Sequence, residues 1–421
     1  MSTISATPWT RLRGHGEPAP PEPVGHDHAD VTSIAIRHID VARGLADEPV
    51  VGRDEFVVLW HRDWPVGQLL GRDAPGPAAR LRDRVPPDVH ARAVAGVALE
   101  RAGRPPDGRK VSVVICTRNR AEELSRCLAS LPRQSRVPDQ VVVVDNASRD
   151  DGRTRAAALA AGVDYVREDR PGLDIARNRG LHAATGDIVA FTDDDVRLHP
   201  RWLERLTAAF DADGVMAVTG LVLPAELETA AQLHFETYWG FGRGYRPIDF
   251  GADFFRTDRT HGCPAWEIGA GANMAFRRET FRRAGLFDER LDVGAAGCSG
   301  DSEYWHRVLF HGGICRYEPA AVAFHYHRRE FADLSRQIFA YMRGHAAALL
   351  VQYERSGNPG SLRRALATLP AWYARRWLRR ALRGRAENDL LLAEETRGFI
   401  SGLLFYMCAP RPRPTPLDER L

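Results

Sequence analysis

The chain has 421 residues, of which 44% are hydrophobic and 27% charged, and its formal net charge is +3. This composition is typical of a globular protein with room for two or three domains. It excludes nucleic-acid binding through overall charge, and no apolar run reaches the roughly 18 residues that a membrane span needs.

The N-terminal residues and the cysteines bear on the cellular compartment. Residues 1–30 are polar and rich in Pro, Gly and His, which predicts a disordered segment and no secretory signal peptide. The six cysteines show no CxxC pair and no regular spacing. We therefore expect reduced thiols in a cytoplasmic protein.

Residues 31–104 are predicted to form a small β-rich module. Strands are expected near 31–38, 55–60 and 65–70, and a helix near 89–102. No residue pattern here indicates chemistry, so acceptor binding and contact between the subunits of a homodimer both remain open as its role. The Pro- and Gly-containing stretch 101–110 predicts a linker to the next domain.

Residues 110–329 alternate apolar runs with helical segments, which predicts βαβ units and a mixed, mainly parallel α/β sheet. Residues 225–263 look irregular and aromatic, and a strand is expected near 321–324. The other expected strands are 111–116, 140–144, 163–166, 187–192 and 215–220, and the expected helices are 121–131, 152–161, 173–184, 200–210, 279–284 and 304–311.

Polar side chains follow three of these strands. Thr117 comes after the first strand, Asp145 after the second, and Asp193 after the fourth. Parallel sheets bind ligands at the carboxyl ends of their strands. We therefore expect these side chains to line one site.

Three consecutive carboxylates end the fourth strand. In extended backbone, Asp193 and Asp195 share a face while Asp194 points elsewhere. Adjacent anions repel, and alternate carboxylates suit Mg²⁺ or Mn²⁺, which keep positions open for phosphate oxygens. The alternative is a solvated acidic turn before the helix at 200–210.

Residues 330–421 are predicted to be a helical region. The stretch 361–385 carries eight arginines and no acid, interleaved with Leu and Trp and interrupted by Pro370. Such a stretch can lie on an anionic membrane surface, here the inner face of the cell membrane. Packing on the preceding domain or on a second subunit is the alternative.

Five stretches, in order, resemble the family 2 glycosyltransferases, which have the GT-A nucleotide-sugar-binding fold. They lie between residues 110 and 327 and read "VSVVICTRNR", "VVVVDNASRD", "RPGLDIARNRGLHAATGDIVAFTDDDV", "GAGANMAFRR" and "GDSEYWHRV". The resemblance implies an inverting, metal-dependent glycosyltransferase of hexosyl or deoxyhexosyl groups. Its donor would be a UDP- or dTDP-sugar, and its acceptor a polysaccharide under biosynthesis, a lipid-linked glycan or a small natural product.

The resemblance also implies residue roles. Asp301 matches the family's catalytic base. Asp193 and Asp195 match its DxD metal motif, and His325 matches a histidine that completes the metal site, with His327 two residues along as the other candidate. The implied donor-binding residues are Thr117, Arg120, Asp145, Arg170, Arg177, Asn178, Asp193, Asp194 and Gly271.

The chain departs from the family pattern before the helix near 304–311. The usual Glu-Asp pair is Gly300-Asp301 here, so the first acid is missing. Ser299 or Asp301 is also expected to cap that helix.

Two other functions remain open. A nucleotidyltransferase would carry a Gly-rich phosphate loop after the first strand, whereas residues 117–120 contain no glycine. A non-catalytic nucleotide-sugar binder would have no use for the retained acids Asp193, Asp195 and Asp301.

Overall fold

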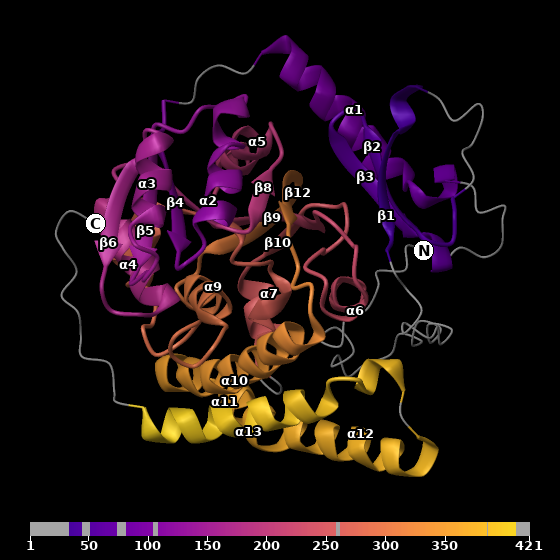
Figure 1. Cartoon of the computed structure of the whole chain (residues 1–421), viewed down its shortest axis with the longest axis vertical. Coiled ribbons are helices and arrows are strands. Elements are labelled where there is room, and N and C mark those ends of the chain that lie inside the picture. The colour runs from indigo at the N-terminus through magenta and orange to yellow at the C-terminus, as the bar shows by residue number, and fades with distance from the viewer. Residues whose placement is uncertain are drawn as a thin grey trace.

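The structure is a computed structural model that describes residues 33–43, 51–73, 81–103, 108–257, 262–384 and 386–409. The disorder expected for residues 1–30 lies outside these residues. Figure 1 shows a small sheet with helix α1 at one side, a large central sheet flanked by helices, and a layer of helices beneath it.

The small N-terminal sheet contains the three predicted strands. β1 (Ala35–Asp40) pairs parallel with β2 (Glu55–His61), which pairs antiparallel with β3 (Trp64–Leu70). The predicted helix is α1 (Pro87–Ala102), which has Pro87 and Pro86 at its N-terminus, where a missing N–H costs nothing.

The central sheet has the strand order β10-β12-β9-β11-β7-β4-β5-β6, and β8 pairs with β12. β7, β4, β5 and β6 run parallel, as do β9 and β12, whereas β11 runs antiparallel to both of its neighbours. The sheet is therefore mixed, as expected. Its strands are β4 Val111–Thr117, β5 Gln140–Asn146, β6 Asp164–Glu168, β7 Ile188–Asp193, β8 Val196–Leu198, β9 Val215–Pro224, β10 Ile248–Phe250, β11 Asn273–Arg277 and β12 Ile314–His325.

Burial on both faces explains the sequence of the central strands. Every residue of β9 is buried, and β4 and β7 are buried over nearly their whole length. Such strands read as continuous apolar runs rather than as alternating ones. The helices against them are α2 Ala121–Leu128, α3 Arg153–Ala160, α4 Leu173–Ala183, α5 Trp202–Ala208, α8 Arg278–Ala284 and α9 Gly300–Phe310.

The expectation of irregular structure over 225–263 is wrong. This region contains α6 (Ala230–Trp239), β10 and α7 (Ala252–Thr257). α6 begins with a capping box in which Thr229 and Gln232 bond each other's backbone, a local signal of a helix start. Most of its residues are buried on several sides, so the amphipathic period that identifies a surface helix is absent.

The small sheet is fastened to the central domain through α5 and β12. Arg92 on α1 donates to Glu318 on β12 at 2.6 Å, and Arg205 on α5 donates to Glu100 at 2.9 Å. The Trp60 ring stacks on His199, with centroids 5.5 Å apart. These contacts place the module against the end of the sheet where β12 lies.

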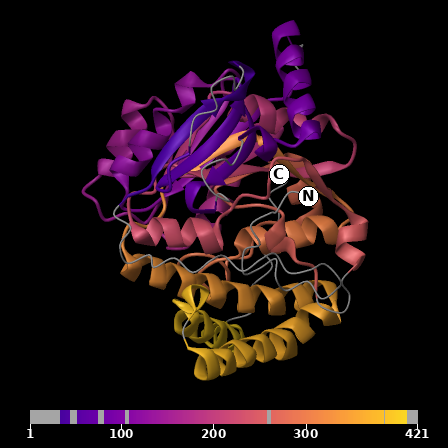
Figure 2. The same cartoon turned by 90° about the vertical axis from the view of Figure 1, so that its right-hand side faces the viewer.

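The C-terminal region is helical, as expected, and forms a separate layer (Figure 2). It comprises α10 (Phe331–Ser356), α11 (Pro359–Arg363), α12 (Leu369–Arg383) and α13 (Leu392–Cys408). Pro370 lies in the first turn of α12, after a π-helical segment at Arg364–Thr368. Helical structure runs without a gap from residue 359 to 383, so the interruption predicted here takes the form of this π-helical segment, a local departure from the regular α-helix.

Candidate functional site

The carboxyl ends of β4, β5 and β7 meet at one edge of the sheet. Cys116 on β4 lies beside Asp193 on β7, and the next residue, Thr117, lies beside Asp145 on β5. The strand register thus brings together the polar clusters that the sequence placed after three separate strands.

Asp194 is not part of the Asp193–Asp195–His325 group, but it shares Arg120 with Asp195. Its carboxylate accepts hydrogen bonds from the Thr117 hydroxyl at 2.7 Å and from Arg120 at 3.0 Å. Burial and the nearby Asp195 raise the pKa of Asp194 to about 7. This carboxylate links the end of β7 to the loop that follows β4.

Asp193, Asp195 and His325 form a group that fits a divalent cation. Their ligand atoms all lie within 4.8 Å of one another. His325 reaches the two carboxylates because β12 pairs with β8, which puts His325 opposite Val196, the residue after Asp195. Two carboxylates and one imidazole are suitable ligands for Mn²⁺. The two carboxylates also suit Mg²⁺, whose remaining coordination positions stay open for phosphate oxygens.

Positive groups keep Asp195 ionised. Burial would raise its pKa, but His325, Arg120 and Arg328 hold the pKa of Asp195 well below its usual range. Arg120 lies 2.8 Å and Arg328 3.5 Å from the carboxylate. By contrast, burial and the anionic Asp195 raise the pKa of Asp193 to about 6.

His327 and Glu236 orient the ring of His325. His325 Nδ1 lies 3.0 Å from His327 Nδ1, and His327 Nε2 lies 3.1 Å from Glu236. Burial lowers the pKa of His327, and its Nε2 proton faces the Glu236 carboxylate, which can only accept. His327 Nδ1 then accepts from His325 Nδ1–H, which turns His325 Nε2 toward Asp195 Oδ1, 3.3 Å away.

These contacts distinguish the two histidine candidates for the metal site. His325 lies beside Asp193 and Asp195, whereas His327 contacts the far side of the His325 ring. Sequence reasoning missed Glu236, because it lies on α6 in the region expected to be irregular. The capping box of that helix was the signal that could have located it.

A second cluster surrounds Arg177 on α4. Its Nη1 donates to Asp174 at 2.9 Å and to Asp292 at 2.6 Å, and its side chain is 5% exposed. A Cβ atom on Gly271 would lie 2.8 Å from Arg177 Nη2 and 2.9 Å from Asp301 Oδ2. Arg177 and Asp301 therefore converge on Gly271, where a side chain has no room.

Asp301 carries a raised pKa, which burial and the neighbouring Asp292 cause against the opposing effect of Arg177. Its Oδ1 accepts from the backbone N–H of Ser302 at 2.6 Å. Ser299, one of the two expected caps, occupies the N-cap position of α9, but its φ is 72° and its side chain makes no capping bond. That left-handed residue turns the chain so that α9 starts at Gly300.

The two clusters belong to one region. The Thr192 hydroxyl on β7 donates to the backbone oxygen of Ala272 at 3.0 Å, which fastens the Gly271 loop to the strand that ends in Asp193. The Arg177 charge acts on both Asp193 and Asp301. Arg177 thus couples the metal-ligating group, through Asp193, with the Asp301 carboxylate of α9.

Three hydrogen-bond donors fix the carboxylate of Asp145. Its carboxylate accepts from the Ser148 backbone at 3.0 Å, from the Tyr165 hydroxyl at 2.7 Å and from Arg167 at 2.9 Å. These donors lower the pKa of Asp145 against the effect of burial. An anionic acceptor is therefore fixed at the tip of β5.

Two predicted donor-binding residues lie in different settings. The Arg170 side chain is 61% exposed and pairs with Glu168 and Glu289. Asn178 is buried, and its amide exchanges two hydrogen bonds with the Phe287 backbone at 3.0 and 2.9 Å. Asn178 therefore holds the loop that leads to Asp292.

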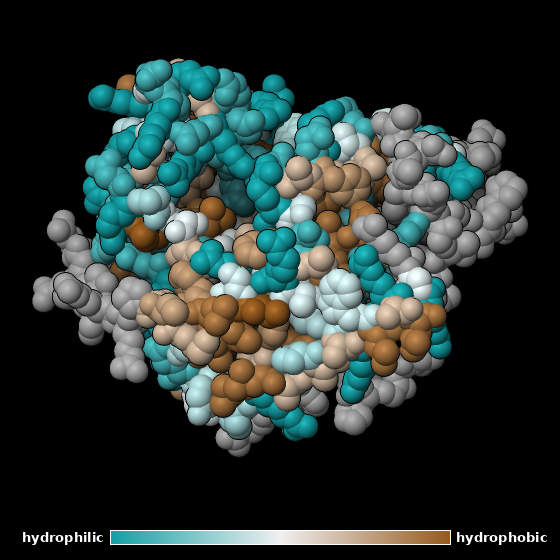
Figure 3. Space-filling model, turned by 60° about the horizontal axis from the view of Figure 1, so that its bottom comes forward, coloured by the Kyte–Doolittle hydropathy of each residue, from teal (hydrophilic) through white to brown (hydrophobic). Residues whose placement is uncertain are grey.

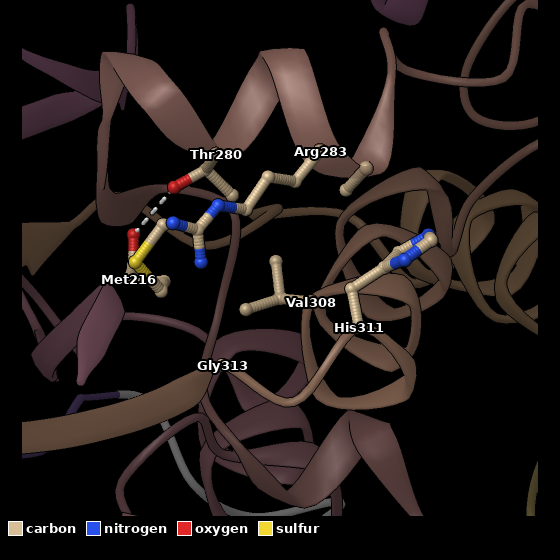
Figure 4. A pocket seen from close by; sticks show the side chains of 7 residues that line it. Met216, Thr280, Arg283, Val308, His311 and Gly313 are labelled. Atoms are coloured by element: carbon tan, nitrogen blue, oxygen red, sulfur yellow. Dashed lines mark hydrogen bonds between the residues drawn. The ribbon is translucent and has the colours of Figure 1, made fainter.

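A small recess lies at the opposite edge of the sheet, where β9 and β12 begin (Figure 4). Thr280 donates to the Met216 carbonyl there at 3.1 Å. None of the predicted site residues lines it. The lining residues are Met216, Thr280, Arg283, Ala284, Val308, His311 and Gly313.

The sequence of residues 112–284 matches the family model described as Glycosyl transferase family 2. A glucosyl-dolichyl phosphate glucuronosyltransferase of Haloferax volcanii is 29% identical over 42% of this chain and 56% of its own length. A pre-mycofactocin glycosyltransferase of Mycobacterium tuberculosis is 30% identical over 61% of this chain and 51% of its own length. The chain thus spans about half the length of these curated relatives.

A solved mannosyltransferase from Pyrobaculum calidifontis, in complex with GDP-Man and Mn²⁺, aligns with a TM-score of 0.45. It is 21% identical, and the alignment covers 76% of this chain and 95% of that chain.

Mn²⁺ should raise the melting temperature of the wild-type protein, and Asp195→Asn should remove most of that rise. An ion that binds only the folded state adds about 2.7 kcal/mol at 100 times its Kd. Thermal unfolding with and without Mn²⁺ measures this. Asp249→Asn is the control, since this half-exposed carboxylate on β10 pairs with Arg316 outside the cluster and should leave the Mn²⁺-induced shift intact. An equal loss of the shift in both variants would contradict the assignment.

Proposed function

We propose that this chain, whose residues 112–284 belong to glycosyl transferase family 2, transfers a sugar from a nucleoside-diphosphate donor to an acceptor hydroxyl with inversion. The observation that carries the proposal is the convergence of two groups at one sheet edge. Asp193, Asp195 and His325 form the first, and Arg177 and Asp301 meet beside Gly271 in the second.

The first group would hold the donor's diphosphate end. Asp193, Asp195 and His325 would ligate Mg²⁺ or Mn²⁺, which when bound supplies Lewis-acid charge to the departing diphosphate. Arg120 and Arg328, each about one-third exposed beside Asp195, are placed to donate charge-assisted hydrogen bonds to phosphate oxygens. Thr117 orients the end of β7 by donating a hydrogen bond to Asp194.

The second group would act on the acceptor. Asp301 accepts the proton of the incoming hydroxyl, and its raised pKa makes it a stronger base than an exposed aspartate. Gly271 has no Cβ, which lets Arg177 and Asp301 approach the backbone of its loop closely. A single base on the face opposite the leaving group gives direct displacement and inversion at the anomeric carbon.

Asp145 would accept a hydrogen bond from the nucleobase at the tip of β5, and Arg170 would contact the donor from the exposed rim. We propose a UDP- or dTDP-linked hexose or deoxyhexose as the donor. A polysaccharide, a lipid-linked glycan and a small natural product are the acceptor classes. The dolichyl-phosphate glycan named for the Haloferax relative supports the lipid-linked class. The family match does not favour nucleotidyl transfer.

Asp301→Asn should lower kcat by roughly 10²- to 10⁴-fold, because the amide cannot take the proton. Donor binding should survive, because the diphosphate site lies on other residues. Nucleotide release from candidate sugar donors measures turnover, and calorimetry measures donor affinity. In the wild type, kcat/KM should fall as the pH drops through the raised pKa of Asp301.

Asp249→Asn is the control for this variant, because Asp249 is a half-exposed carboxylate on β10 paired with Arg316. It should keep wild-type turnover. Full activity of Asp301→Asn, or loss of donor binding together with turnover, would contradict the role of Asp301.

The outer face of α12 and α13 is proposed to contact an anionic membrane surface. Exposed apolar side chains gather on the bottom face of the molecule (Figure 3). Leu382 is 74% and Met407 69% exposed. The other exposed apolar residues of this face are Trp377, Leu378, Ile400 and Leu404.

The charge of this face is positive. Arg363, Arg375, Arg383 and Arg397 are exposed, and none of them has a carboxylate partner in the part of the chain that the structure describes. The acids Asp389 and Glu395 are buried against Arg376. Among the described residues, no helix combines the length and the apolar character needed to cross a bilayer, so the proposed contact is peripheral.

The double variant Leu378→Gln, Leu382→Gln should bind anionic vesicles at least roughly tenfold more weakly than the wild type, since each leucine contributes about 1.5–3 kcal/mol on burial. Co-sedimentation with vesicles that contain phosphatidylserine measures this, and pure phosphatidylcholine vesicles should bind less. Leu99→Gln is the control, because Leu99 is 72% exposed on the distant α1. Unchanged vesicle binding, with a changed oligomeric state, would instead make this face a subunit interface.

A further inference from the structure

Residue 300 is a glycine where the family pattern has a glutamate, and a carboxylate from another helix lies in the space beside it. A Cβ atom on Gly300 would lie 2.0 Å from Asp174 Oδ2 and 2.6 Å from its Cγ. Asp174 comes from the first turn of α4, and Gly300 is the first residue of α9. The two residues are 126 positions apart in the sequence and share one space.

Glycine at residue 300 is required by space rather than by backbone conformation. Gly300 is not among the residues with positive φ, whereas the preceding Ser299 is. Any other residue would fit the Gly300 backbone, but its Cβ would overlap the Asp174 carboxylate. The glycine and the aspartate are therefore a matched pair.

Asp174 also touches the arginine of the second cluster. Its Oδ1 accepts from Arg177 Nη1 at 2.9 Å, whereas its Oδ2 has no hydrogen-bond partner among the residues that the structure describes, and the residue is 1% exposed. Leaving a buried carboxylate oxygen without a partner is costly. The carboxylate is thus held between Arg177, which bonds one oxygen, and Gly300, whose missing side chain makes space for the other.

We propose that Asp174 is a positioning residue for Asp301, and that it supplies from α4 the acid that this chain lacks at residue 300. Its charge holds Arg177 together with Asp292, and its carboxylate packs against the start of α9. The proposal rests on the function proposed above and extends it to a residue that makes no contact with the reacting atoms.

A stability cycle tests the matched pair without any assay of activity. Gly300→Ala should lower the Tm of the wild-type protein, because the new methyl group overlaps Asp174. In the Asp174→Gly background the same change should leave the Tm unchanged or raise it, since the space is then free. Equal Tm losses in both backgrounds would overturn the packing relation.

Kinetics test the role of the charge. Asp174→Asn keeps the volume of the side chain, and we expect it to lower kcat at least roughly tenfold with little change in the KM for the donor. Without the Asp174 carboxylate, Arg177 is less neutralised beside Asp301, so the acid limb of the pH profile should move toward lower pH. A wild-type rate and pH profile in Asp174→Asn would overturn the positioning role.

A double variant that moves the carboxylate from residue 174 to residue 300 tests whether turnover can be restored. Asp174→Gly should lose turnover, and the double variant with Asp174→Gly and Gly300→Glu should regain most of it. Failure of the rescue in a double variant that melts like the wild type would count against the proposal. Absence of turnover in the wild type with every nucleotide sugar would instead refute the proposed function, and the Tm cycle would still decide whether the two residues are matched.

Discussion

The structure depends on keeping six buried or half-buried carboxylates at one edge of a sheet. Asp193, Asp194 and Asp195 end β7, and Asp174, Asp292 and Asp301 gather beside them on other elements. Such charges are stable out of water only when cations or hydrogen-bond donors pair with them. Arg120, Arg177, Arg328 and His325 supply that pairing in the protein itself.

The rest of the fold positions these partners. The pairing of β8 with β12 carries His325 to Asp195 over 130 residues of sequence. α6 supplies Glu236, which fixes the ring of His327 and through it that of His325. Asn178 holds the loop that contains Asp292 and thereby shapes the acidic cluster.

Local signals in the sequence predicted much of this arrangement. The family match and the mixed sheet confirm the expected GT-A fold class, because buried strands and helices repeat with clear periods up to β9. The Asp193–Asp195 alternation also predicted which carboxylates face one another. Glu236 was missed because α6 is buried on several sides and lacks an amphipathic pattern. Asp174 was missed because the sequence shows a glycine at residue 300 but not which distant side chain occupies the space beside it.

The central claim is that Asp195 and His325 hold the cation that meets the donor's diphosphate. Anomalous diffraction at the manganese edge, from crystals grown with Mn²⁺ and UDP or dTDP, tests it most directly. The account predicts a peak within ligand distance of Asp195, His325 and a diphosphate oxygen, with Asp301 facing the same cavity. A diphosphate bound away from Asp195, or a manganese peak beside other residues alone, would contradict it.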